Sequence, residues 1–128
     1  MLVLTDIDEE FVIDVVANSA VDVYASFNDI GMPNLTLPQP GNVSFTALRS
    51  ERNSLGGPPT LGYVRQYKSI YVVNRHVSAG ANVTMLFIRG SEEYQIKKYT
   101  LTAGQHASYI DGVGFTWFTS TGAPVAPV

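Results

Sequence analysis

The feature of this sequence that most constrains its fold is the abundance of β-branched residues in short runs. Val, Ile and Thr account for 32 of the 128 residues, accompanied by 7 Tyr and 6 Phe. These side chains suit the pleated surface of a strand better than a helix. The 11 Gly and 7 Pro separate the runs, a spacing typical of a sandwich or barrel. We therefore predict an all-β, antiparallel β-sandwich of jelly-roll or immunoglobulin-like type with long Pro-rich loops.

Alternating patterns identify the strands of the first half. Within residues 21–27 and 42–48, apolar and polar side chains alternate, which predicts strands with one buried face. Residues 11–16 are β-branched and are expected to form a strand. Thr5, followed three residues later by Asp8, could cap one short helical turn near residues 6–10. The fold is therefore expected to contain at most a short N-terminal helix.

The second half contains the clearest strand pattern. Strands are predicted over residues 68–74, 82–89, 94–101, 106–110 and 115–119, joined by short Gly-containing turns. We expect them to form an antiparallel meander. The predicted organisation is an arm or first strand over residues 1–19, a sandwich domain over 20–122 and an extended tail over 123–128.

Two segments are predicted to form loops. Residues 28–41 contain three Pro and cannot form a central strand, because Pro lacks a backbone donor. Leu35 and Leu37 still need an apolar partner, so this segment lies either on its own sandwich or, as an arm, on a neighbouring subunit. Residues 51–62 have Gly-Gly-Pro-Pro at their centre and are expected to be exposed and mobile.

Charge is unevenly distributed along the chain. Residues 1–48 carry seven acids and no Lys or Arg, whereas residues 49–98 carry all eight bases and three acids, within a net charge of −3. Two interpretations remain open. Either an acidic face meets a basic face of a neighbouring copy, or the two segments neutralise each other within one monomer. Because the bases are scattered singly and the chain is net acidic, we expect no nucleic-acid binding.

No residue pattern indicates catalysis or metal binding. There is no Cys, and neither His76 nor His106 has further ligands at metal-binding spacing. Residues 5–10 contain four acidic side chains but lack the residue pattern of a calcium-binding loop. Nucleophile-elbow, phosphate-loop and dinucleotide motifs are absent from the sequence. We therefore expect no metal site, no cofactor and no enzymatic activity.

The N-terminal residues have no basic region ahead of their apolar positions, so we expect no signal peptide. No apolar run approaches the roughly 20 residues of a membrane helix. These patterns predict a chain with no signal peptide and no membrane span.

Trp117 allows two interpretations. It could form a sugar-stacking platform with the tyrosines. Alternatively, Phe115 and Trp117 lie on one side of an edge strand and anchor the core or an interface, where buried aromatic residues contribute most energy. We favour the second interpretation.

Several runs together resemble small structural proteins of tailed bacteriophages. They are residues 68–76 (KSIYVVNRH), 83–87 (VTMLF), 98–104 (KYTLTAG) and 109–115 (YIDGVGF). Residues 21–27 (VDVYASF) are similar to the opening strand of those proteins. The resemblance covers about residues 20–122 and is tight from about 67 to 118. The shared motifs describe turns and core faces, so the resemblance transfers no functional residues.

The resemblance implies a virion-associated sandwich, made in the host cytoplasm and built into a multimer on the capsid, neck or tail. We therefore expect an accessory virion structural protein, either a capsid decoration or a vertex, neck or collar component that anchors a fibre. Its expected partners are further copies of itself, as a homotrimer or higher oligomer, and virion proteins such as major capsid, neck or tail subunits. The residues expected at interfaces are Leu35, Leu37, Arg49, Arg65, Arg75, Trp117, Pro124 and Val125.

Two other functions remain open. The first is a carbohydrate- or receptor-binding module of a tail or adhesion apparatus, which would use Trp117 and the tyrosines to bind a cell-surface glycan. The second is a cellular sandwich domain that forms part of a longer protein.

Overall fold

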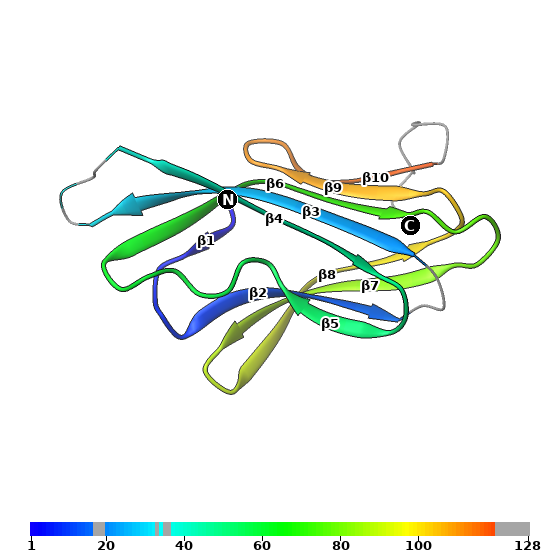
Figure 1. The fold of residues 1–128 in the computed structure, drawn as a ribbon, viewed down its shortest axis with the longest axis horizontal. Coiled ribbons are helices and arrows are strands. Elements are labelled where there is room, and N and C mark those ends of the chain that lie inside the picture. The colour runs from blue at the N-terminus through cyan, green and yellow to red at the C-terminus, as the bar shows by residue number, and fades with distance from the viewer. Residues whose placement is uncertain (17–19, 33, 35–36, 120–128) are drawn as a thin grey trace.

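The structure is a computed structural model that describes residues 1–16, 20–32, 34 and 37–119. Within these residues it contains strands and no helix, and the strands form two antiparallel sheets packed face to face (Figure 1). The predicted all-β sandwich is confirmed. The strands are β1 (Val3–Leu4), β2 (Glu9–Val16), β3 (Val21–Gly31), β4 (Gln39–Ala47), β5 (Glu51–Ser54), β6 (Tyr63–Asn74), β7 (Ala81–Arg89), β8 (Glu92–Leu101), β9 (His106–Ile110) and β10 (Gly114–Phe118).

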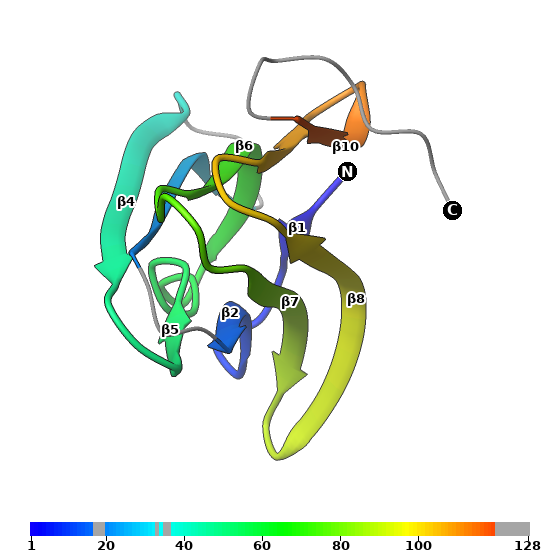
Figure 2. The ribbon, with the colours of Figure 1, turned by 90° about the vertical axis from the view of Figure 1, so that its right-hand side faces the viewer.

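The chain passes repeatedly between the two sheets. Sheet A has the order β10-β9-β6-β3-β4, with β1 paired to β6, and sheet B has the order β5-β2-β7-β8. Figure 2 shows the two layers from the side. The predicted meander over the second half is wrong as a topology. β7 and β8 form a hairpin in sheet B, β9 and β10 form one in sheet A, and β9 pairs with β6. The alternation of apolar residues predicts where strands occur, but it does not determine to which sheet each strand belongs.

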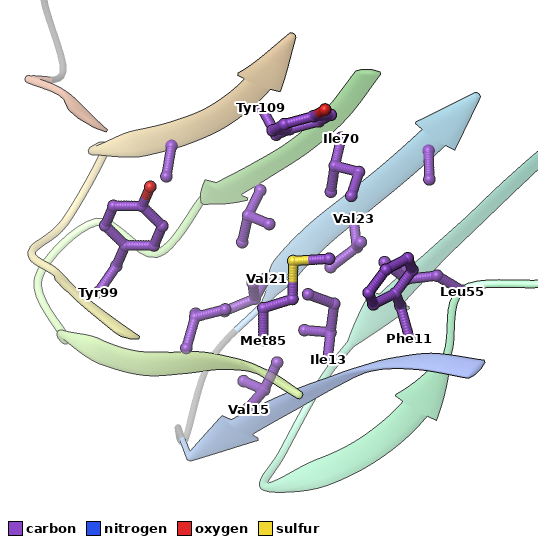
Figure 3. Close-up of a cluster of buried hydrophobic side chains, with 14 of the residues drawn as sticks. Phe11, Ile13, Val15, Val21, Val23, Leu55, Ile70, Met85, Tyr99 and Tyr109 are labelled. Atoms are coloured by element: carbon purple, nitrogen blue, oxygen red, sulfur yellow. The ribbon is translucent and has the colours of Figure 1, made fainter. Parts of the chain in front are cut away.

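The core lies between the inner faces of the two sheets. The predicted inward side chains of residues 21–27 and 43–47 do face it, and β2 and β7 supply the opposite wall. Phe11 packs against Tyr67 with ring centroids 5.2 Å apart in an edge-to-face arrangement, which suits aromatic rings. Figure 3 shows aliphatic and aromatic side chains of this cluster, which lie between the strands and point toward one another.

The N-terminal segment is part of the sandwich. β2 lies between β5 and β7 in sheet B, and β1 pairs with β6 in sheet A. The optional helix near residues 6–10 does not form. Instead, the buried Glu9 carboxylate accepts hydrogen bonds from the backbone N–H groups of Thr5 (2.9 Å) and Asp6 (3.0 Å). A tight turn results, and it leads directly into β2.

The expectation for residues 51–62 is wrong. Residues 51–54 form β5, and Leu55 is fully buried. The Arg65 guanidinium donates to the carbonyl oxygens of Gly56 (2.8 Å) and Gly57 (3.1 Å), and the Tyr67 hydroxyl donates to that of Leu55. Gly56 has a φ of 92° and lies against the Phe27 ring and Arg65, so a side chain there would be both strained and crowded. Buried donors from β6 thus fix a segment whose composition resembles a free loop.

Candidate binding face

Ion pairs cover the outer face of sheet B. Arg52 on β5 pairs with Glu93 on β8, and its guanidinium also lies 3.6 Å from Asp14. Because β5 and β8 are the two edges of this sheet, the Arg52–Glu93 pair crosses the middle strands β2 and β7. On those strands Val12 and Leu86 point outward, opposite each other in register, yet both are buried. The apolar residues in the middle of this face are therefore already covered within the chain, while Val16 at the end of β2 is 56% exposed.

The outer face of sheet A has a different composition. Strand register places its outward side chains in three rows that run across five strands. Only one Asp, Glu, Lys or Arg occurs among them, which is Asp22; the rest are small polar, aromatic or aliphatic residues. The rows are Thr46, Asp22, Val73, His106 and Phe118; Ser44, Tyr24, Tyr71, Ser108 and Thr116; and Asn42, Ser26, Ser69, Ile110 and Gly114.

Two tyrosines occupy the middle of this face. Tyr24 on β3 and Tyr71 on β6 lie directly opposite each other, so their Cβ atoms are about 5 Å apart. Their exposed fractions are 42% and 40%. They border a surface hollow of about 410 Å³, which we call the tyrosine hollow. Its other lining residues are Asp22, Val23, Ser44, Phe45, Thr46 and Val73.

The polar end of the tyrosine hollow is held in place. The Thr46 hydroxyl donates to the Asp22 carboxylate at 2.6 Å, and Arg75 pairs with the same carboxylate. The side chains of Arg75 and Asp22 keep exposed fractions of 54% and 37%. A paired carboxylate and guanidinium therefore stand beside two aromatic rings, with donor and acceptor groups still open to solvent.

The edges of the two sheets also differ. Sheet A ends in β4 and β10, and neither strand contains a charged residue. Sheet B ends in β5, with Glu51 and Arg52, and in β8, with two Glu and two Lys. Pro40 lies in the edge strand β4, where a missing backbone donor is tolerated. The expectation that residues 28–41 form no central strand is wrong for residues 28–31, which extend β3 and pair with β6, because the three Pro all lie after them. Charge on an edge opposes pairing with another chain. Among the described edge strands, β4 with nine residues and β10 with five lack that protection.

The structure brings some of the predicted interface residues together and separates others. Leu37 precedes β4 with an exposed fraction of 88%, and the exposed Arg49 follows the same strand. Arg75 lies at the tyrosine hollow. Arg65 has a different place, since it is only 7% exposed and bonds Asp29 at 2.8 Å. Three predicted residues lie outside the described part of the chain: Leu35, Pro124 and Val125.

Arg65 therefore stabilises the fold of its own chain. Burial by itself lowers the pKa of its guanidinium, but the hydrogen bond and charge of Asp29 outweigh this and raise that pKa overall. Its guanidinium carbon also lies 4.1 Å from the centre of the Phe27 ring, within the range of a cation–π contact. The sequence shows Arg65 as one more basic residue of the middle segment, and only strand pairing places it inside.

The uneven charge distribution is explained largely within the chain. Glu9, Asp14, Asp22 and Asp29 from the acidic segment each pair with an arginine from the basic segment. This supports the interpretation in which the two segments neutralise each other in one monomer. An assembly surface then need not depend on charge.

Trp117 faces the core and not the tyrosine hollow. Its ring meets Tyr99 edge-to-face with centroids 5.8 Å apart, and both it and Phe115 pack on the buried cluster. Phe115 and Trp117 thus anchor the core from an edge strand, which is one of the two roles in the favoured interpretation, and an interface role for Trp117 stays a prediction. The Tyr99 hydroxyl and the Trp117 Nε1 are buried with no hydrogen-bond partner among the described residues. Burial raises the pKa of Tyr99 to about 12.

Sequence reasoning missed the tyrosine hollow. One signal was available, since the alternation in residues 21–27 places Asp22, Tyr24 and Ser26 on the side opposite the apolar residues. An aromatic residue on a polar face is informative. Tyr71 carried no such signal, because its opposition to Tyr24 depends on the register between β3 and β6.

The described residues contain no group of three or more His, Cys, Asp or Glu placed to hold a metal ion. The part of the chain that the structure describes holds no helix long and apolar enough to cross a membrane. No family model matches the sequence, and no match was found among curated proteins or solved structures.

Proposed function

We propose that the protein is an accessory structural protein of a bacteriophage virion, either a capsid decoration or a vertex, neck or collar component. It acts by docking on neighbouring subunits, which include further copies of itself. The virion setting is supported by the runs over residues 68–76, 83–87, 98–104 and 109–115, which resemble small phage structural proteins.

The observation that carries the docking role is the uncharged edge of sheet A. β4 is nine residues long and contains no charged side chain. Its backbone pairs with β3 on one side only, so its outer side can receive a strand from another subunit. Leu37 lies two residues before this strand and Arg49 two residues after it, in the connection to β5, and both are exposed. Among the interface residues expected from the sequence, these two are best placed for docking.

Light scattering of the purified protein tests the docking role. We expect a discrete mass of at least three times 13.9 kDa that changes little with salt, because the ion pairs form within the chain. Asn42→Lys places a charge on β4 and should reduce the mass to that of a monomer. Gln95→Lys makes the same change on the edge strand β8 and should leave the mass unchanged. A wild-type monomer, or equal effects of both variants, would contradict the docking role.

The virion setting needs a separate test. Particles purified through a density gradient from the virus that encodes the chain should contain it in a fixed ratio to the major capsid protein. Its absence from intact particles would overturn the setting while leaving the result for β4 unaffected.

A further inference from the structure

The tyrosine hollow combines the two kinds of surface that a sugar ring requires. A pyranose has flat C–H faces and a rim of hydroxyl groups. Tyr24 and Tyr71 present exposed aromatic surface, on which C–H faces pack, and the Asp22–Arg75 pair presents acceptors and donors suited to hydroxyl groups. The hydroxyls of Ser44 and Thr46 lie on the same side of the hollow.

The polar groups are positioned before any ligand arrives. Thr46 fixes one Asp22 oxygen, and Arg75 holds the carboxylate from the end of β6. Both tyrosines stand on strands in the interior of sheet A, with β3 and β6 each paired on both sides. A site on such rigid elements loses little entropy when a ligand binds.

Charge in the tyrosine hollow favours a neutral ligand. The single carboxylate among the lining residues is paired with Arg75, so the hollow carries no uncompensated charge. An anionic ligand would meet Asp22, and a cationic one would compete with Arg75 for it. The hollow also lies on the face of the sheet, whereas an extended peptide would gain its backbone hydrogen bonds at an edge.

The volume of the tyrosine hollow is suited to a small saccharide. About 410 Å³ falls within the range of roughly 300–1,000 Å³ for small-molecule sites. We propose that the tyrosine hollow binds a neutral saccharide, with Tyr24 and Tyr71 stacking on the sugar and Asp22 and Arg75 binding its hydroxyls. This function is additional to docking through β4 and does not depend on it.

Amide chemical shifts of the labelled full chain test the proposal, with lactose, maltose and cellobiose as separate probes. We expect at least one disaccharide to shift amides around residues 22–24, 44–46 and 71–73 in a saturable way. Tyr24→Ala and Tyr71→Ala should each weaken that binding by about tenfold, the loss expected for one stacking contact. Asp22→Asn should also weaken it.

The matched control is Tyr94→Ala, which removes a tyrosine that is 51% exposed on β8 of sheet B. Its binding should equal that of the wild type. Absence of binding to all three disaccharides would overturn the proposal, as would equal losses in Tyr94→Ala and Tyr71→Ala. If Tyr24→Ala or Tyr71→Ala lowers the mass measured by light scattering and leaves saccharide binding unchanged, the hollow is a protein contact and the proposal fails. Asn42→Lys changes a side chain that does not line the hollow, so the docking and saccharide results can be separated.

Discussion

The two sheets of the sandwich share a core, but their outer faces differ. Sheet B buries Val12 and Leu86 on its outer face, where Arg52 reaches across to Glu93, and both of its edges carry charge. Sheet A leaves Tyr24 and Tyr71 exposed on its outer face and has uncharged edges. The outer face of sheet B is thus largely covered and its edges carry charge, whereas the outer face and the edges of sheet A are open. Sheet A is therefore the sheet available for contact with other molecules.

The ion pairs of the two sheets also differ in their burial. On sheet B the Arg52 pairs lie at the surface, where salt bridges contribute little. In sheet A the buried Arg65 pairs with the half-buried Asp29 and fixes the segment after β5. The Arg65–Asp29 pair therefore matters for folding, whereas the surface pairs of Arg52 are expected to contribute little to stability.

The largest expected effect separates buried from exposed ion pairs. Arg65→Met should lower the free energy of unfolding by about 3–5 kcal/mol, because it leaves the Asp29 charge without its partner. Chemical denaturation measures this loss. Arg75→Met makes the same change in an exposed pair and should alter the stability only slightly. Similar losses in the two variants would show that the Arg65 pair is not the structural anchor described above.

The next prediction compares the two outer faces directly. Leu86→Ala on sheet B should cost about 2–3 kcal/mol, since Leu86 is buried on the outer side of a middle strand. Tyr71→Ala on sheet A, also on a middle strand, should change stability by only about 0.5 kcal/mol because the side chain is exposed. Thermal or chemical denaturation of both variants checks the difference. A larger loss for Tyr71→Ala would mean that sheet A also depends on its outer face for stability.

Acid should weaken the turn before β2. Burial by itself raises the pKa of the Glu9 carboxyl, but bonds from Arg89 and Thr5 outweigh this and lower the pKa below 4.5 overall. The contribution of Glu9 is therefore present above pH 4.5 and is lost as the pH falls through the lower folded value. Glu9→Gln should cost about 1.5–3 kcal/mol at neutral pH, the range for hydrogen bonds to a charged group. In denaturation series against pH, the gap to wild type should close in acid, and a gap that stays constant to low pH would refute this.

The smallest expected effect is a gain in stability. Tyr99→Phe removes a buried hydroxyl that has no partner among the described residues and should stabilise the fold by about 1 kcal/mol. Because the folded pKa is raised from 10.0 to about 12, the wild type should also lose stability as the pH rises from 10 towards 12. The variant should lose less over that interval, while Tyr67, whose pKa burial also raises to about 12, titrates in both proteins. Denaturation at neutral and alkaline pH measures both effects, and a destabilised variant would contradict the first.

Local patterns in the sequence predicted the strands well and the topology less well. Alternation in residues 21–27 identified the buried side of β3, and residues 106–110 match β9. The crossing from β6 in sheet A to β7 in sheet B was not predictable in this way, because period-2 alternation is the same in either sheet. Leu55 was misjudged for a related reason, since it is buried in a core cluster formed by residues from other strands, and the Tyr67 hydroxyl on β6 bonds its carbonyl oxygen.

The candidate site was only partly visible in the sequence. Leu37 and Arg49 were identified from composition, and the structure places them at the two ends of β4. Tyr24 could be assigned to a polar face by alternation, but its meeting with Tyr71 depends on pairing 47 residues apart in the chain. Arg65 could not be distinguished from the surface arginines, because burial of a charge requires a partner that only tertiary structure supplies.

The central claim is that subunits assemble through sheet A and not through sheet B. Its most direct test is hydrogen exchange of backbone amides across a range of protein concentration. We expect amides in residues 41–46 of β4 to become protected as subunits assemble, while those of β5 and β8 exchange at unchanged rates. In Asn42→Lys the protection of β4 should stay at its dilute value. If β4 shows no concentration dependence, or if β8 gains as much protection as β4, sheet A is not the sheet through which the protein assembles.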